Sequence, residues 1–103
     1  MPPKDTKETY QHKTELRLKK IRTGITSLEK KAQETEADIK VRHDQKLSQI
    51  RGQYAQAKET LNELGKSTQV AWRELRAMLD ESIDVLEEAI NIMSRRISAP
   101  TKD

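Results

Sequence analysis

The apolar positions of this chain follow the seven-residue repeat of a coiled coil over most of its length. They recur at alternating steps of three and four residues from Leu18 to Ile39 and again from Leu47 to Leu64. Between these runs, two successive steps of four pass through His43, a stutter that locally relaxes a supercoil. No proline lies between residues 4 and 99. The pattern therefore predicts one long helix over about residues 5–64.

A second apolar repeat begins at Trp72 and continues to Ile97, which predicts a second helix over about residues 68–98. Between the two repeats lies a glycine followed by small polar residues. Gly65 suits a left-handed position after a helix, and Ser67 or Thr68 suits the N-cap of the next one. The sequence therefore predicts a hairpin turn at Gly65 and Ser67.

The two repeats also match each other in an antiparallel register. Facing positions such as Leu61 with Trp72 and Ile39 with Met93 have residue numbers that add to 132 or 133. The fold class predicted is all-α, a long antiparallel helical hairpin that forms a single domain over residues 1–103. Segments 1–4 and 99–103 are expected to be disordered tails. The predicted hairpin core consists of Leu47, Ile50, Tyr54, Leu61, Trp72, Leu79, Leu86 and Ile90.

Two apolar sets remain uncovered in such a hairpin. One is the N-terminal part of the first repeat, which extends beyond the shorter second helix. The other is a stripe beside the second repeat with members seven residues apart, which makes that helix apolar over a broad face. We expect both sets to mediate self-association into a helical bundle, as a homo-dimer or tetramer. They comprise Leu18, Ile21, Ile25, Leu28, Met78, Val85 and Ile92.

The composition agrees with a coiled coil rather than a compact globule. Apolar residues make up 33% of the 103 residues, charged residues make up 36%, and phenylalanine is absent. Cysteine is also absent, so the chain has no disulfide or thiolate chemistry. The start lacks the apolar segment of a signal peptide, and no run is long enough to span a membrane. These features predict a cytoplasmic protein.

The charges are unevenly distributed. Residues 1–31 contain nine basic and four acidic residues, a net charge of +5, whereas residues 80–88 contain five acids and no base. One interpretation is that lysines and arginines of residues 13–31 pair with these acids in a second chain; the other is a solvated acidic face. The alternative function is a charge-driven binder of nucleic acid or an anionic membrane, through Lys19, Lys20 and Arg22.

Catalytic, cofactor and metal motifs are absent from the sequence. No Glu-x-x-His pair of a di-iron bundle occurs, and the Gly-Lys-Ser at residues 65–67 lacks the upstream glycine of a phosphate-binding loop. His43 is expected to be a tolerated polar core position and His12 to be solvated. We therefore expect no enzyme, no cofactor and no small-molecule substrate, and the leading hypothesis is a structural or adaptor protein that self-associates.

The second half of the chain carries a resemblance. It contains Ala71-Trp72, then Leu75-Arg76, and ends in Ser94-Arg95 after a charged helix and a small polar turn. In this it resembles a group of small bacterial coiled-coil proteins of uncharacterised function. The resemblance implies a coiled coil and a bacterial origin, and it implies no activity or ligand.

Overall fold

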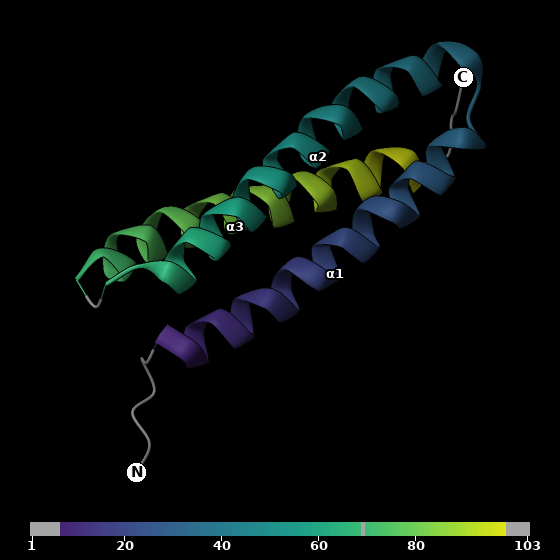
Figure 1. The fold of residues 1–103 in the computed structure, drawn as a ribbon. Helices are drawn as coiled ribbons and strands as arrows, with labels where there is room; N and C mark the ends of the chain where they lie inside the picture. The colour runs from purple at the N-terminus through teal and green to yellow at the C-terminus, as the bar shows by residue number, and fades with distance from the viewer. Residues whose placement is uncertain (1–6, 69, 99–103) are drawn as a thin grey trace.

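Three helices of similar length lie side by side in the computed structural model, which describes residues 7–68 and 70–98 (Figure 1). They are α1 (Lys7–Gln33), α2 (Ala37–Lys66) and α3 (Ala71–Ser98). Helix α2 runs antiparallel to the other two, so α1 and α3 are parallel. The all-α prediction is confirmed. The predicted tails at residues 1–4 and 99–103 lie outside the described residues.

The predicted two-helix hairpin is wrong, because the long first helix is divided. A helix over residues 5–64 would be about 90 Å long, whereas the longest dimension of the molecule is 56 Å. The chain leaves the helix after Gln33, turns through residues 34–36 and re-enters a helix at Ala37. The result is a three-helix bundle.

The first turn is made by backbone bonds of the tighter three-residue type. Glu34 N–H donates to Lys31 O at 3.1 Å, and Thr35 N–H donates to Ala32 O at 3.2 Å. The Thr35 hydroxyl donates to the same Ala32 carbonyl at 2.6 Å. Glu36 is then extended, with a ψ of 155°, and α2 starts beyond it. These bonds satisfy carbonyls at the end of α1 that the helix itself leaves without a partner.

Burial of the N-terminal apolar repeat explains why the chain reverses. Its members are only 3–5% exposed, so the prediction that they lack a partner in their own chain is wrong. Burying four such side chains contributes roughly 6–12 kcal/mol, whereas the break gives up a few backbone bonds of about 1 kcal/mol each. The four residues are Leu18, Ile21, Ile25 and Leu28.

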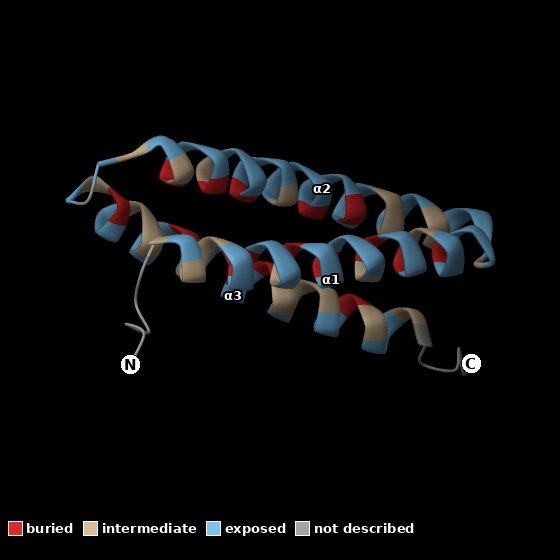
Figure 2. Cartoon of the chain, turned by 60° about the horizontal axis from the view of Figure 1, so that its bottom comes forward, coloured by how far each residue is buried: buried red, intermediate tan, exposed pale blue. Residues whose placement is uncertain are grey.

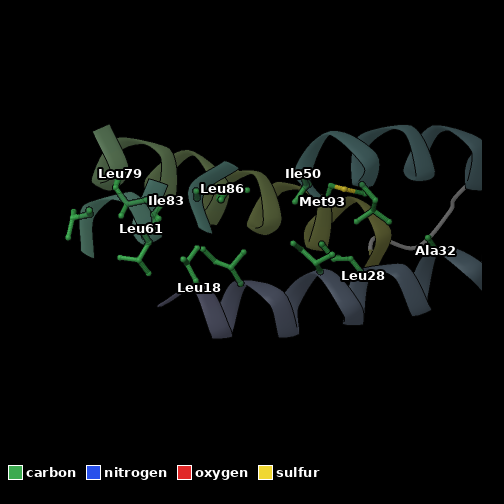
Figure 3. Packing of buried hydrophobic residues seen from close by; sticks show 14 of the residues in the cluster. Leu18, Leu28, Ala32, Ile50, Leu61, Leu79, Ile83, Leu86 and Met93 are labelled. Atoms are coloured by element: carbon green, nitrogen blue, oxygen red, sulfur yellow. The ribbon is translucent and has the colours of Figure 1, made fainter. Parts of the chain in front are cut away.

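The core lies along the axis between the three helices, with exposed residues on the outer faces (Figure 2). Figure 3 shows Leu18 and Leu28 of α1 together with Leu61 of α2 and Leu86 of α3 around this interior. Of the predicted hairpin core, Tyr54 and Ile90 are partly buried and pack against the cluster. The other six are buried: Leu47, Ile50, Leu61, Trp72, Leu79 and Leu86.

The second turn falls where it was predicted, but its chemistry differs. Gly65 has no positive φ and lies inside α2, which continues to Lys66. The carbonyl of Leu64 accepts bonds from both the N–H and the hydroxyl of Ser67, at 3.1 and 2.6 Å. Thr68 caps the next helix as expected, because its Oγ1 accepts a bond from Ala71 N–H at 3.2 Å.

Gly65 instead provides space for the side chain of Gln11 on α1. A Cβ at position 65 would clash with the Gln11 amide nitrogen. The sequence shows no sign of this contact, because α1 was not expected to reach the second turn. The contact places α1 beside the end of α2, and a methyl group at position 65 would require the flexible end of Gln11 to move.

Candidate functional site

The outer face of α3 carries an exposed apolar stripe, and this stripe is the strongest candidate for a binding surface. Met78, Val85 and Ile92 are 61%, 51% and 37% exposed, respectively. A spacing of seven residues corresponds to almost two helical turns, so all three lie on one side of α3. Of the seven residues predicted to mediate self-association, these three remain on the surface, and the four of α1 belong to the core.

The stripe borders an open groove between α2 and α3. At one end Met78, Ser82 and Val85 of α3 face Ala57 of α2 across this groove. Farther along, Val85, Ala89 and Ile92 lie opposite Ile50. The lining of the groove is therefore mixed, with apolar side chains of both helices beside polar ones, and its α2 wall includes the amides of Gln49, Gln53 and Gln56.

A second stripe, of acidic residues, runs beside the apolar one on α3. Glu74, Glu81 and Glu88 are exposed and also lie seven residues apart. Arg95 continues this line near the end of the helix and is exposed. A helix that docked on the apolar stripe would therefore have charges along one flank and glutamines along the other, as in the flanking positions of a coiled coil.

The remaining acids of the 80–88 segment are turned toward α1. Arg17 of α1 donates to Asp84 at 2.9 Å and to Glu87 at 2.7 Å. Its hydrogen bond with Glu87, followed by that with Asp84, raises the pKa of Arg17. A basic residue of the 13–31 segment does neutralise this acidic region, but it comes from the same chain, so this pair gives no reason to place a second chain here.

An aromatic cluster joins α1 to the start of α3. Trp72 is 3% exposed, and its ring centre lies 6.1 Å from that of Tyr10. The Arg76 guanidinium lies over both rings, 5.2 Å from Tyr10 and 5.7 Å from Trp72. The Tyr10 hydroxyl donates to Asp80 at 2.6 Å. Burial of Trp72 gives it a packing role at the closed end of the bundle.

Burial is also the first cause of a raised Tyr10 pKa. Removal of the side chain from water disfavours the phenolate, and the hydrogen bond to Asp80 adds to this effect. Sequence reasoning did not single out Tyr10 as a contact of α3, although it lies seven residues before Arg17, which faces the same helix.

The two histidines occupy different environments. His43 is partly buried and lines a groove with Ile39 and Met93, two residues that the predicted register had paired. His12 is exposed on α1. Among residues 7–68 and 70–98, no group of three or more histidine, aspartate or glutamate side chains is close enough to hold a metal ion.

The cations of the alternative anion-binding set are exposed but spread around α1. Lys20 and Arg22, two residues apart, point in nearly opposite directions on a helix. Arg22 lines a groove with Tyr54 and Lys58 of α2. Lys19 is exposed on the part of the α1 surface between Lys20 and Arg22. The structure does not gather the three side chains into one patch.

Comparison with known proteins adds no family. No protein-family model, curated protein or solved structure matches this chain. The likeness of its second half to small bacterial coiled-coil proteins therefore stays a prediction. Within the described residues, none of the helices is long and apolar enough to cross a membrane.

Proposed function

We propose that this chain is a non-enzymatic helical association module that binds a second copy of itself through the outer face of α3. The observation that carries the proposal is the exposure of Met78, Val85 and Ile92 along one side of α3. Single exposed apolar residues need no explanation, but an aligned set of them beside a groove between two helices is typical of a helix-docking surface.

The spacing of the stripe suits a two-fold symmetric pair of antiparallel α3 helices. With Val85 at the symmetry axis, Met78 of one chain lies opposite Ile92 of the partner subunit. The same register places Glu74 beside Arg95 of the partner subunit at each end of the interface. Such an isologous contact closes after two copies, which favours a dimer over a tetramer.

Two features limit the strength of this pairing. The three side chains are already partly covered, so each contributes less than the roughly 1.5–3 kcal/mol of a fully exposed one. Glu81 also approaches Glu88 of the partner subunit near the centre, and like charges there oppose association. We therefore expect a reversible dimer that strengthens when Glu81 and Glu88 are replaced by glutamine.

Sedimentation over a concentration series tests the proposal. The natural chain should move from monomer to dimer as concentration rises, and Met78→Gln with Val85→Gln should shift this transition to higher concentration. Val41→Gln is the matched control, because Val41 is 56% exposed on a different helix and should have no effect. Equal behaviour of the natural chain and the Met78/Val85 variant would refute the proposal.

Binding of nucleic acid or an anionic membrane is the second candidate, supported by the exposure of Lys19, Lys20 and Arg22. It predicts affinity that falls steeply with salt and with replacement of these three residues by glutamine. Titration with a DNA duplex, an RNA and phosphatidylserine vesicles at low salt is the test. Absence of binding to all three removes this candidate.

A further inference from the structure

The turn between α1 and α2 has a sequence that a helix would also accept. It consists of Glu34, Thr35 and Glu36, with neither glycine nor proline, and none of the three has a positive φ. Glutamate is a good helix former, and threonine is a weak one that is still better than glycine and far better than proline. The bonds that shape the turn come from Lys31 and Ala32, within four residues of it. Nothing in the residue types of this segment requires the chain to reverse.

The other turn has more side-chain bonds. Ser67 ends α2 with the same pair of bonds that Thr35 makes at the end of α1, but Thr68 in addition caps α3, whereas no side chain caps α2. The Lys7 ammonium of α1 also donates to Ser67 O at 2.9 Å. Of the two reversals, the one at residues 34–36 therefore has the weaker local specification.

Straightening the first turn would join α1 and α2 into one helix and remove α1 from its own bundle. Its buried stripe then needs an α2–α3 surface with the same shape, and a second copy of the chain offers one. The contacts of α1, such as Arg17 with Glu87, Tyr10 with Asp80 and Glu29 with Arg51, form again between chains. Exchange of an identical element in this way is a low-cost route to a dimer.

The register between α1 and α2 is compatible with this exchange. Their contacts pair Lys7 with Ser67, Gln11 with Gly65 and Glu29 with Arg51, so residue numbers rise in α1 as they fall in α2. Two continuous helices from two chains, packed antiparallel around a two-fold axis close to residues 37–40, reproduce this order. The same residues thus meet in either form.

We propose that the α2–α3 surface under α1 also binds α1 of a second copy, in a dimer whose residues 34–36 are helical and whose α1 helices are exchanged. This dimer does not use the exposed stripe on α3 and does not depend on the function proposed above. It also explains why the three-and-four spacing of the apolar repeat runs unbroken across the turn, from Leu28 to Ile39: both forms bury the same repeat.

Ala37→Pro is a variant that separates the two forms. Ala37 is the first residue of α2, where proline is favoured, and Glu36 before it has the extended ψ of 155° that a following proline requires. In a continuous helix the same proline would remove a backbone bond and clash with the carbonyl of residue 33. Two such prolines per exchanged dimer should lower its association constant on the order of 10⁴-fold.

Chemical cross-linking between chains gives the readout. One batch carries Glu29→Cys and another carries Arg51→Cys, two positions that form an ion pair in the structure, and the natural chain has no cysteine to interfere. The batches are unfolded, mixed, refolded over a concentration series and treated with a short bis-maleimide. We expect covalent heterodimers that increase with concentration and are lost when both chains also carry Ala37→Pro.

Two controls make the result decisive. A chain with both cysteines and Ala37→Pro should still cross-link within itself, which shows that the bundle folds. Met78→Gln with Val85→Gln should leave the heterodimer yield unchanged, because the α3 stripe is not part of the exchange. Absence of heterodimers at every concentration, or an equal yield with Ala37→Pro, would overturn the proposal.

Discussion

Gly24 of α1 and Ile90 of α3 pack so closely that a Cβ at position 24 would lie 3.3 Å from Ile90 Cγ2. Gly52 of α2, in contrast, has no atom within 4 Å of the corresponding position. Both glycines lie inside helices, where alanine is more stable by about 1 kcal/mol. A methyl group added at position 24 would therefore contact Ile90, whereas one added at position 52 would contact no neighbouring residue.

We expect Gly52→Ala to raise the free energy of unfolding by about 1 kcal/mol, and Gly24→Ala to raise it by less, because Ile90 must move. Urea unfolding of the two variants and the natural chain measures both effects. An equal gain at the two positions would contradict the close contact between α1 and α3.

The ion pairs of Arg17 should stabilise the bundle modestly and in a salt-dependent way. Arg17→Gln leaves Asp84 and Glu87 near each other without their shared cation, and exposed pairs of this kind contribute up to about 1 kcal/mol each. Thermal unfolding at low salt should show the loss, and about 1 M salt should reduce it. Lys20→Gln removes one positive charge from an exposed position of the same helix and should have a smaller effect. A loss that does not change with salt would count against the ion pairs.

Alkaline pH should destabilise the bundle through Tyr10. Its pKa is raised in the folded chain, first by burial and then by the hydrogen bond to Asp80. An unfolded tyrosine ionises at about pH 10, so the stabilising contribution is complete below that pH and is lost as pH rises above it.

Unfolding curves recorded above and below about pH 10 check this effect. Tyr10→Phe should lose less stability on the alkaline side than the natural chain, whereas Tyr54→Phe, which retains Tyr10, should follow the natural chain. Equal alkaline losses in all three proteins would exclude Tyr10 as the source.

The residues of the core could be predicted from the sequence because burial follows the apolar repeat, whichever chain covers it. Leu47 and Leu86 are fully buried, and Ile39 and Met93 share a groove as the predicted register implies. The spacing of the repeat does not indicate which helix covers these apolar residues. Leu18 satisfies the same pattern against its own chain or another, and so the hairpin and the bundle could not be separated on spacing alone.

The first turn was missed because it lacks glycine and proline, the residues that most often mark a helix end. One weak signal was present, the basic pair Lys30 and Lys31 in the last turn of α1. Thr35 and Asp38 have the spacing of a capping box, but the N-cap of α2 is Glu36 and no side chain makes a cap bond there. The stutter near His43 did not mark the turn, because it lies inside α2 and the three-and-four spacing runs unbroken through Thr35. The prediction for Gly65 was wrong for the opposite reason, since a glycine beside polar residues suggests a turn even when it lies inside a helix.

The apolar stripe on α3 could be predicted from the sequence. The burial of the α1 residues that were predicted to share its interface could not. Met78 and Ile25 were assigned to the same role because both lay outside the hairpin core. Only the position of α1 in three dimensions separates them, one exposed and the other buried.

The central claim is that α1 folds back onto α2 and α3 of its own chain, and one distance measurement tests it most directly. Arg22 and Lys58 line the same groove between α1 and α2, so spin labels at these positions, introduced as Arg22→Cys and Lys58→Cys, should be close together. Doubly labelled chain is diluted into a large excess of unlabelled chain at low concentration, so that only distances within one molecule are recorded. The three-helix bundle predicts a short distance, typical of neighbouring helices. A distance near 54 Å, the span of 36 residues in one continuous helix at 1.5 Å per residue, would contradict it when recorded at a concentration where the chain sediments as a monomer.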